Sequence, residues 1–477
     1  MTRVYRFSLL IFASACLGSS FNPECPLPPP GTTYVSGPNI RSTTGILWNC
    51  VSIMILCTWS IQHLNVPSIR PEKKGFIPSM WRTVQKTGIK IKWMVITILV
   101  PEYILSKSLG GWVATRDALD MLYGEPGLEN PWETLHIRLA NLGYFVLDMG
   151  ETWPATAAAF DDNVWKYGSK SSQINKRRFQ HRYWALDAHQ WMRANRKGLT
   201  NLPDIPKQYL EGLDRSGGLV KALALIQVTY LVASLITRKV RGLPSTQLEI
   251  STLAIAVTSF ITYILCWEVP QGVETIHIVP AQSVTQPQEI WSASLEDIGS
   301  NGPLYLWHGR RQYGSIDLSL GPLPIPNDGV NGIQHSEIQT ITRFAPDDGA
   351  YGVEGSIFCL AAIFGGTLFG GLHCLAWNFE FPTEAERTAW RVCSALITAL
   401  PVAAILPMII WTKLNPWLGE PKHPRARKVL GPSIIILFIV PYVIARLFII
   451  AEMIRSLFHL PQEAYVDTWA GAFPHWN

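Results

Sequence analysis

Long apolar runs alternate with polar and proline-rich segments along this chain, and seven of the runs have the length of a membrane helix. A helix that crosses the hydrocarbon core of a bilayer needs about 20 predominantly apolar residues. Tryptophans lie near the ends of most runs, which is typical of the aromatic belt at a membrane surface. The seven runs are Ile46–Leu64, Trp93–Leu109, Leu219–Ile236, Ile250–Trp267, Ser356–Trp377, Trp390–Trp411 and Leu430–Met453.

An eighth stretch, Thr134–Gly150, is a weaker candidate because it contains Arg138 and Asp148. A charge at the bilayer centre costs about 2.5–3.5 kcal/mol on an insertion scale. Both charges lie near the ends of the stretch, where their side chains can reach the membrane surface. We therefore expect seven crossings and leave open whether this stretch crosses or lies at the interface.

The N-terminus has the pattern of a secretory signal. Arg3 and Arg6 precede an apolar core, Phe7–Ala15, and small residues follow it. This core is too short to span a bilayer. We expect a signal peptide that is cleaved near Gly18–Phe21, with an uncleaved anchor as the alternative.

Composition agrees with a membrane protein. Of the 477 residues, 48% are hydrophobic and only 16% are charged, and the mean hydropathy is +0.15. Soluble domains carry about 25% charged residues. The basic residues are clustered, most densely between the first two runs, at Arg70, Lys73, Lys74, Arg82, Lys86, Lys90 and Lys92. Lys and Arg in short loops mark the cytosolic side, so we expect this loop to be cytosolic.

Seven crossings conflict with that rule further along the chain. They place Lys422, Arg425, Arg427 and Lys428 outside, together with the basic stretch Lys176–Lys197. In that stretch Phe179, Tyr183 and Leu186 recur at helical spacing, which predicts an amphipathic helix at an anionic membrane surface. The segment Glu268–Glu354 is rich in turn residues, and "ETIHIVPA" within it favours a short strand.

The resulting fold class is an all-α membrane protein, a polytopic bundle of about seven transmembrane helices after a signal sequence, with two long non-spanning loop regions. The expected division is a signal peptide (1–20), an extracytosolic segment (21–45), two transmembrane helices with a basic cytosolic loop (46–109), a long loop region with the amphipathic basic helix (110–218), transmembrane helices three and four (219–267), a Pro/Gly-rich loop region (268–355), transmembrane helices five to seven (356–453) and a C-terminal tail (454–477).

Charged residues inside the apolar runs are the first candidates for function. Glu102 follows Pro101, and Arg446 and Glu452 lie in the last run. A buried charge in a membrane needs a partner or a polar cavity, and Glu102 is a plausible partner for Arg446. Two readings stay open: a buried pair that fixes helix register, or a cavity for a ligand or a proton.

The stretch "FGGLHCLAWNFEFPTEAERTAWR" is the second candidate. Its glycines allow close helix approach, His373 follows on the same face, and Trp377 and Asn378 mark the membrane boundary. Thr383 and Glu386 have the spacing of a helix cap. The candidate catalytic residues are therefore Glu102 and His373, and the candidate ligand-binding residues are Arg446, Glu452, Trp377 and Asn378.

Motifs of common cofactor and metal sites are missing from the sequence. It has no Walker A loop, no GxGxxG fingerprint, no HExxH and no paired Cys/His spacing. We therefore expect no metal and no cofactor. The expected partners are the lipid bilayer and a lipophilic small molecule, and no nucleic acid.

Four blocks of the sequence resemble an uncharacterised family of multi-pass integral membrane proteins of filamentous fungi. They are "GILWNCVSIMILCTWSIQHLNVP", "LEISTLAIAVTSFITYILCWEVPQGV", "FGGLHCLAWNFEFPTEAERTAWR" and "ARLFIIAEMIRSLFHLPQEAYVDTWAGAFPHWN". Some members of that family lie beside biosynthetic genes for specialised metabolites. The resemblance implies a role ancillary to specialised or lipid metabolism and assigns no reaction.

Three classes of function stay open. The first is a multi-pass membrane protein of unassigned activity, such as a scaffold, sensor or ligand-binding protein. The second is an intramembrane enzyme that cyclises or isomerises a lipid-soluble metabolite, with acid–base work by Glu102 and His373. The third is a transporter. In each case the signal sequence implies entry through the secretory pathway, to the endoplasmic reticulum, plasma membrane or vacuole.

Overall fold

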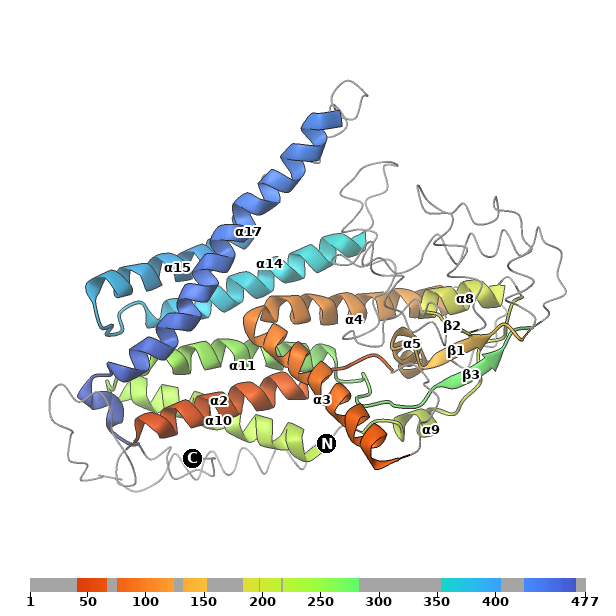
Figure 1. Cartoon of the computed structure of the whole chain (residues 1–477), viewed down its shortest axis with the longest axis horizontal. Coiled ribbons are helices and arrows are strands. Elements are labelled where there is room, and N and C mark those ends of the chain that lie inside the picture. Colours follow the sequence, from red (N-terminus) through yellow and green to blue (C-terminus); the bar gives the residue numbers. More distant parts are fainter. Residues whose placement is uncertain are drawn as a thin grey trace.

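The computed structural model describes residues 41–66, 75–123, 132–151, 183–196, 198–215, 218–282, 353–404 and 424–468. These residues form a bundle of long helices with a smaller α/β module at one end (Figure 1). The strands of the module correct the all-α prediction. The expected signal peptide and most of the Pro/Gly-rich region lie outside the described residues.

Six long helices make up most of the bundle. They are α2 (Thr43–Ser60), α10 (Gly218–Val240), α11 (Gln247–Leu265), α14 (Val353–His373), α15 (Glu384–Ala403) and α17 (Pro424–Arg455). Within the described residues, four helical segments are long and apolar enough to cross a membrane: Thr43–Ser60, Val220–Val240, Gln247–Leu265 and Leu437–Phe458. Four of the seven expected runs are confirmed in this sense, and α14 contributes only a shorter apolar segment, Leu360–Ala376.

The expected membrane helix Trp93–Leu109 is wrong. Its residues are divided between α3 (Phe76–Leu99) and α4 (Pro101–Tyr123), which run in different directions (Figure 1). Val100 between them has φ −141° and ψ 67°. Proline disfavours a helical conformation in the residue before it and lacks the amide hydrogen that would continue the helix. The same helix α3 replaces much of the expected cytosolic loop.

The α/β module consists of short elements. They are α5 (Thr134–Asn141), β1 (Phe145–Asp148), β2 (Tyr183–Ala185), α8 (Ala188–Arg196), α9 (Lys207–Glu211) and β3 (His277–Pro280). The strand order is β2-β1-β3, with β1 antiparallel to β2 and parallel to β3. Strand β3 confirms the strand expected in "ETIHIVPA". The core around Trp132, Phe145 and Trp191 is almost fully buried.

Two further expectations fail in this module. Thr134–Gly150 does not cross a membrane, because it forms an eight-residue helix followed by a turn and a strand. The basic stretch Lys176–Lys197 is not one helix, because Tyr183–Ala185 pair as a strand and the helix begins only at Ala188. Its first residues, 176–182, lie outside the described part of the chain.

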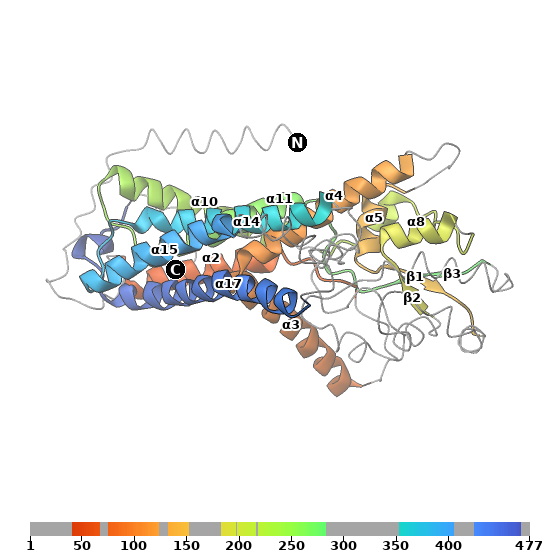
Figure 2. The same ribbon diagram turned by 90° about the horizontal axis from the view of Figure 1, so that it is seen from above.

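Hydrogen bonds between segments at the ends of the helices define the two ends of the bundle. At one end, which we call the Arg41 end, the Arg41 amide donates to the Tyr465 carbonyl at 3.1 Å, and Gln247 at the start of α11 donates to the Glu380 carbonyl at 2.6 Å. At the opposite end, which we call the module end, Gln271 donates to the Ser60 carbonyl at 2.6 Å. The module lies beyond that end (Figure 2).

Candidate functional site

The structure pairs Glu102 with Arg446, as the sequence analysis expected. Glu102 lies in the first turn of α4 and Arg446 in α17, and the closest carboxylate oxygen and guanidinium nitrogen are 3.5 Å apart. The Tyr442 hydroxyl donates to the other Glu102 oxygen at 2.6 Å. Both charged side chains are less than 10% exposed. The two groups therefore form a buried ion pair, with Tyr442 hydrogen-bonded to the carboxylate, and this pair joins two helices far apart in the sequence.

The surroundings of this pair are tightly packed. A Cβ atom on Gly365 of α14 would come within 3.0 Å of the Glu102 Cβ, so only glycine permits this approach of α14 to α4. The Arg446 guanidinium lies over the Phe369 ring at 3.7 Å from its centroid, a cation–π contact. Backbone and an aromatic ring, rather than open space, surround the two charges.

His373 lies next to the same phenylalanine on α14. The two rings are 4.5 Å apart, and the His373 Nδ1 contacts the Phe369 carbonyl at 2.7 Å. Because a carbonyl only accepts, Nδ1 carries the hydrogen and Nε2 carries a lone pair. Nε2 is buried and has no hydrogen-bond partner among the described residues. Phe369 contacts both Arg446 and His373. These contacts give no evidence of a cavity between the two side chains.

Trp377 and Asn378 belong to the hairpin that joins α14 to α15. Arg391 donates to the Trp377 carbonyl at 2.8 Å and to the Asn378 side chain at 3.3 Å. Thr383 caps α15 by accepting from the Glu386 amide at 3.2 Å, as its position predicted. Both Trp377 and Asn378 are exposed. Their contacts explain them as residues that hold the hairpin together.

Glu452 does not join the buried pair. It follows Arg446 by six residues on α17, which places it on a different face and about 9 Å further along the helix. The side chain is buried, and its Oε1 has no hydrogen-bond partner among the described residues. The structure thus brings Glu102 and Arg446 together, places His373 nearby and separates the other three candidates from them.

A second polar network, at the Arg41 end, was missed by the sequence analysis. The Arg238 side chain at the end of α10 is almost fully buried, and within the described part of the chain its hydrogen bonds all go to backbone carbonyls. Its nitrogens reach Pro244 at 2.9 Å, Val466 at 2.8 Å and Ala464 at 3.0 Å. One arginine therefore ties the α10–α11 turn to the C-terminal segment.

Glu249 in the first turn of α11 completes this network. It accepts from the Thr246 amide at 2.8 Å in a capping box, and it pairs with Arg41 at the start of the chain's described part. The Thr246–Glu249 spacing was visible in the sequence as a capping signal. The contact between Glu249 and Arg41 could not be predicted from the sequence, because it depends on the fold.

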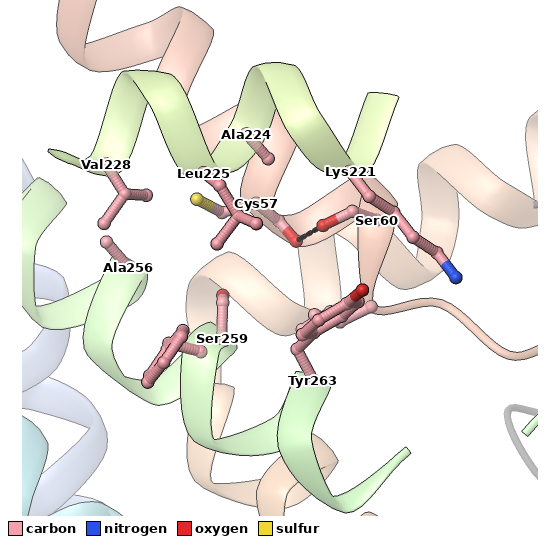
Figure 3. A pocket seen from close by; sticks show the side chains of 11 residues that line it. Cys57, Ser60, Lys221, Ala224, Leu225, Val228, Ala256, Ser259 and Tyr263 are labelled. Atoms are coloured by element: carbon pink, nitrogen blue, oxygen red, sulfur yellow. Dashed lines mark hydrogen bonds between the residues drawn. The ribbon is translucent and has the colours of Figure 1, made fainter. Parts of the chain in front are cut away.

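A small pocket lies between α2, α10 and α11 (Figure 3). Its volume is about 40 Å³, and its walls are mostly apolar, with Lys221 and Tyr263 at one end. The Ser60 hydroxyl at its rim is turned to its own helix, where it donates to the Cys57 carbonyl at 3.0 Å. Sites for drug-sized ligands span roughly 300–1,000 Å³, so this pocket suits water rather than a metabolite.

His63 lies buried where α2 leaves the bundle. Its Nε2 is 3.1 Å from Nε2 of Gln271, the residue that also binds the end of α2. Burial, with a smaller contribution from the nearby positive charge of Lys221, lowers the pKa of His63 from 6.5 to about 3. His63 therefore stays neutral in the folded protein throughout the physiological range.

We expect thermal stability to fall as the pH drops below about 6.5, because the unfolded chain then protonates His63 while the folded chain does not. The full contribution is present above pH 6.5. The unfolding midpoint of the detergent-purified protein should therefore decline from pH 7.5 to pH 5. His63→Gln should show a clearly smaller decline, and identical declines in the two proteins would contradict this assignment.

These features define a mostly helical protein that has four helices long and apolar enough to cross a membrane, a buried ion pair between one of them and α4, and an α/β module at one end. The chain is similar to the family described as Family of unknown function (DUF8562), whose model matches residues 19–118 and 197–290. Those ranges hold less than half of the chain and include Glu102, Arg238 and Glu249. No curated protein and no solved structure matches the chain.

Proposed function

We propose that this chain is a multi-pass integral membrane protein with a scaffolding role, which holds its α/β module at the cytosolic membrane surface. The helical bundle anchors the module, and the module supplies the surface for a partner or a lipophilic ligand. The resemblance described above adds that this role is ancillary to specialised or lipid metabolism in a filamentous fungus.

The single observation that carries this proposal is the continuity of α4. At its first turn Glu102 is held in the bundle by Arg446 and Tyr442. Further along the same helix, Ala118 and Leu122 are part of the module's core. One unbroken helix therefore links the ion pair to the module, and fixing the register of α4 fixes the module against the membrane.

An even number of crossings is part of the proposal, and we assign six, by α2, α10, α11, α14, α15 and α17. The hydrogen bond from Arg41 to Tyr465 supports an even number, because seven crossings would leave these two residues on opposite sides of the membrane. Removing Trp93–Leu109 from the expected seven gives six without an additional crossing at Thr134–Gly150.

Six crossings also relieve the conflict in the positive-inside rule. The basic residues of α3 then lie on the same side of the membrane as Arg425, Arg427 and Lys428 in the first turns of α17. We take this side, the module end, as cytosolic. Entry through the secretory pathway then places the Arg41 end in the lumen or outside the cell.

The enzyme hypothesis receives less support from the geometry. Acid–base catalysis by Glu102 and His373 needs a substrate within hydrogen-bond reach of both groups. Instead, Gly365 packs against Glu102, and the Phe369 ring lies against His373 and Arg446. The transporter hypothesis has no specific contact in its favour.

The double variant Glu102→Gln/Arg446→Met separates these hypotheses, because it removes both charges and leaves no unpaired one. A scaffold should tolerate it, because the close packing of α14 at Gly365 still holds α4 in register, and the variant should restore the metabolite profile of a strain that lacks the gene. An enzyme that uses Glu102 should be folded and inactive. Full folded yield with no rescue in lipid-extract metabolomics would therefore overturn the scaffold role.

A further inference from the structure

Helix α3 presents an apolar stripe that no described part of the chain covers. Ile77 is 73% exposed and Trp81 is 60% exposed, far above what a packed helix allows. At 100° per residue the stripe covers roughly 100° of the helix surface, the width of an ordinary core-facing stripe. Its exposed members are Ile77, Met80, Trp81, Val84, Ile91 and Val95.

The opposite face of α3 is basic and is attached to the rest of the protein. Lys86, nine residues after Ile77 and therefore on the opposite face, pairs with Glu274 at 2.8 Å. Glu274 lies in the segment that enters β3, so the polar face of α3 looks toward the module. The apolar stripe therefore faces away from the module.

The depth of α3 is fixed by α2. The Lys90 ammonium lies 5.1 Å from the ring centroid of Trp59, in the last turn of α2. This contact places the middle of α3 at the level where a membrane-crossing α2 would reach the headgroups, the level that tryptophan prefers. Four basic residues within α3 argue against a crossing of its own.

We propose that α3 is a membrane-embedded helix that runs obliquely through the cytosolic leaflet, from the headgroup layer at its start toward Glu102 in the bundle, with its apolar stripe toward the lipid and its basic face toward the headgroups and the module. The inference rests on the proposed membrane insertion of α2 and α10. It adds a second, lateral attachment beside the bundle, because the 24 residues of α3 extend over about 36 Å. Such helices bind in proportion to the apolar area they bury.

Single cysteines that carry an environment-sensitive fluorophore test this placement in protein reconstituted into liposomes. Ile77→Cys and Val84→Cys report on the stripe, and Ser79→Cys reports on the polar face of the same turn. Ile226→Cys on the exposed side of α10 reports on the proposed crossing helix. Each label is exposed in turn to a lipid-borne quencher and to aqueous iodide.

We expect the lipid-borne quencher to reduce emission at positions 77, 84 and 226, and iodide to reduce it at position 79. Iodide quenching at 77 and 84 with lipid quenching at 226 would overturn the membrane placement of α3 alone. Iodide quenching at 226 as well would overturn the proposed membrane insertion. Protection of 77 and 84 from both quenchers would indicate a protein partner on the stripe and would also overturn the inference.

Each single-cysteine variant requires a chain from which the eight native cysteines have been removed, and producing that chain is the most difficult part of this experiment. Cys50, Cys57 and Cys266 are buried, so a chain that retains these three and lacks the other five is the second background. Gel filtration of each labelled protein against the unmodified chain verifies folding. The same pattern of quenching is expected in both backgrounds.

Discussion

Replacing Gly370 with leucine is expected to destroy the contact between α14 and α15. A Cβ atom at this position would lie 2.5 Å from the Thr398 amide nitrogen and 2.8 Å from the Ile397 carbonyl carbon. Both are backbone atoms, which cannot rotate away as a flexible side chain could. The helices must then separate, so the free energy of unfolding should fall by about 3 kcal/mol or more, at or above the upper end of the typical range for overpacking.

Gly371→Leu is the matched control, because nothing lies within 4 Å of a Cβ at that neighbouring position. Expression, gel-filtration profile and thermal unfolding in detergent should be near those of the unmodified protein for Gly371→Leu and severely impaired for Gly370→Leu. Equal behaviour of the two variants would mean that Gly370 faces lipid and that α15 packs elsewhere.

Loss of the Glu102 charge is the second change with a large expected effect. In Glu102→Gln, Arg446 stays buried against Phe369 and Tyr442 without its counter-charge. Removing one partner of a buried ion pair typically costs about 3–5 kcal/mol. We expect a corresponding fall in thermal stability and in folded yield, measured in detergent on the purified protein.

The double variant Glu102→Gln/Arg446→Met should recover most of this loss, because it leaves no buried charge unpaired. Glu384→Gln serves as a surface control, since the Glu384 side chain is 79% exposed. Exposed pairs contribute about 0–1 kcal/mol. A double variant as unstable as the single one would show that the carboxylate acts through Tyr442 or the backbone rather than through Arg446.

Four of the expected runs form helices long and apolar enough to cross a membrane, and they show what hydropathy can establish without a fold. An apolar run as long as those of α2, α10 and α11 has few alternatives to a buried or lipid-facing helix. Trp93–Leu109 passed the same test of length, because averaging over a window hides the break that Pro101 imposes. Its two halves belong to helices with different surroundings, which no average over neighbouring residues can detect.

The buried pair was predictable for a related reason. An arginine in the middle of an apolar run needs a counter-charge, and Glu102 was one of few acids available to Arg446. Tyr442 and Phe369, which complete the site, are ordinary residues of apolar helices and carry no such signal. The Arg41–Glu249 contact joins positions more than 200 residues apart. It depends on where the helix ends meet, and only the fold shows that.

Cysteine labelling on both sides of α10 tests the central claim, the membrane insertion of the helical bundle, most directly. Glu211→Cys lies before α10 at the module end, and Arg241→Cys and Ala385→Cys lie at the Arg41 end, all three at exposed positions. In intact cells that display the protein at the plasma membrane, an impermeant maleimide should label positions 241 and 385. Position 211 should react only after permeabilisation. Labelling of positions 211 and 241 from the same side of an intact membrane would contradict the account.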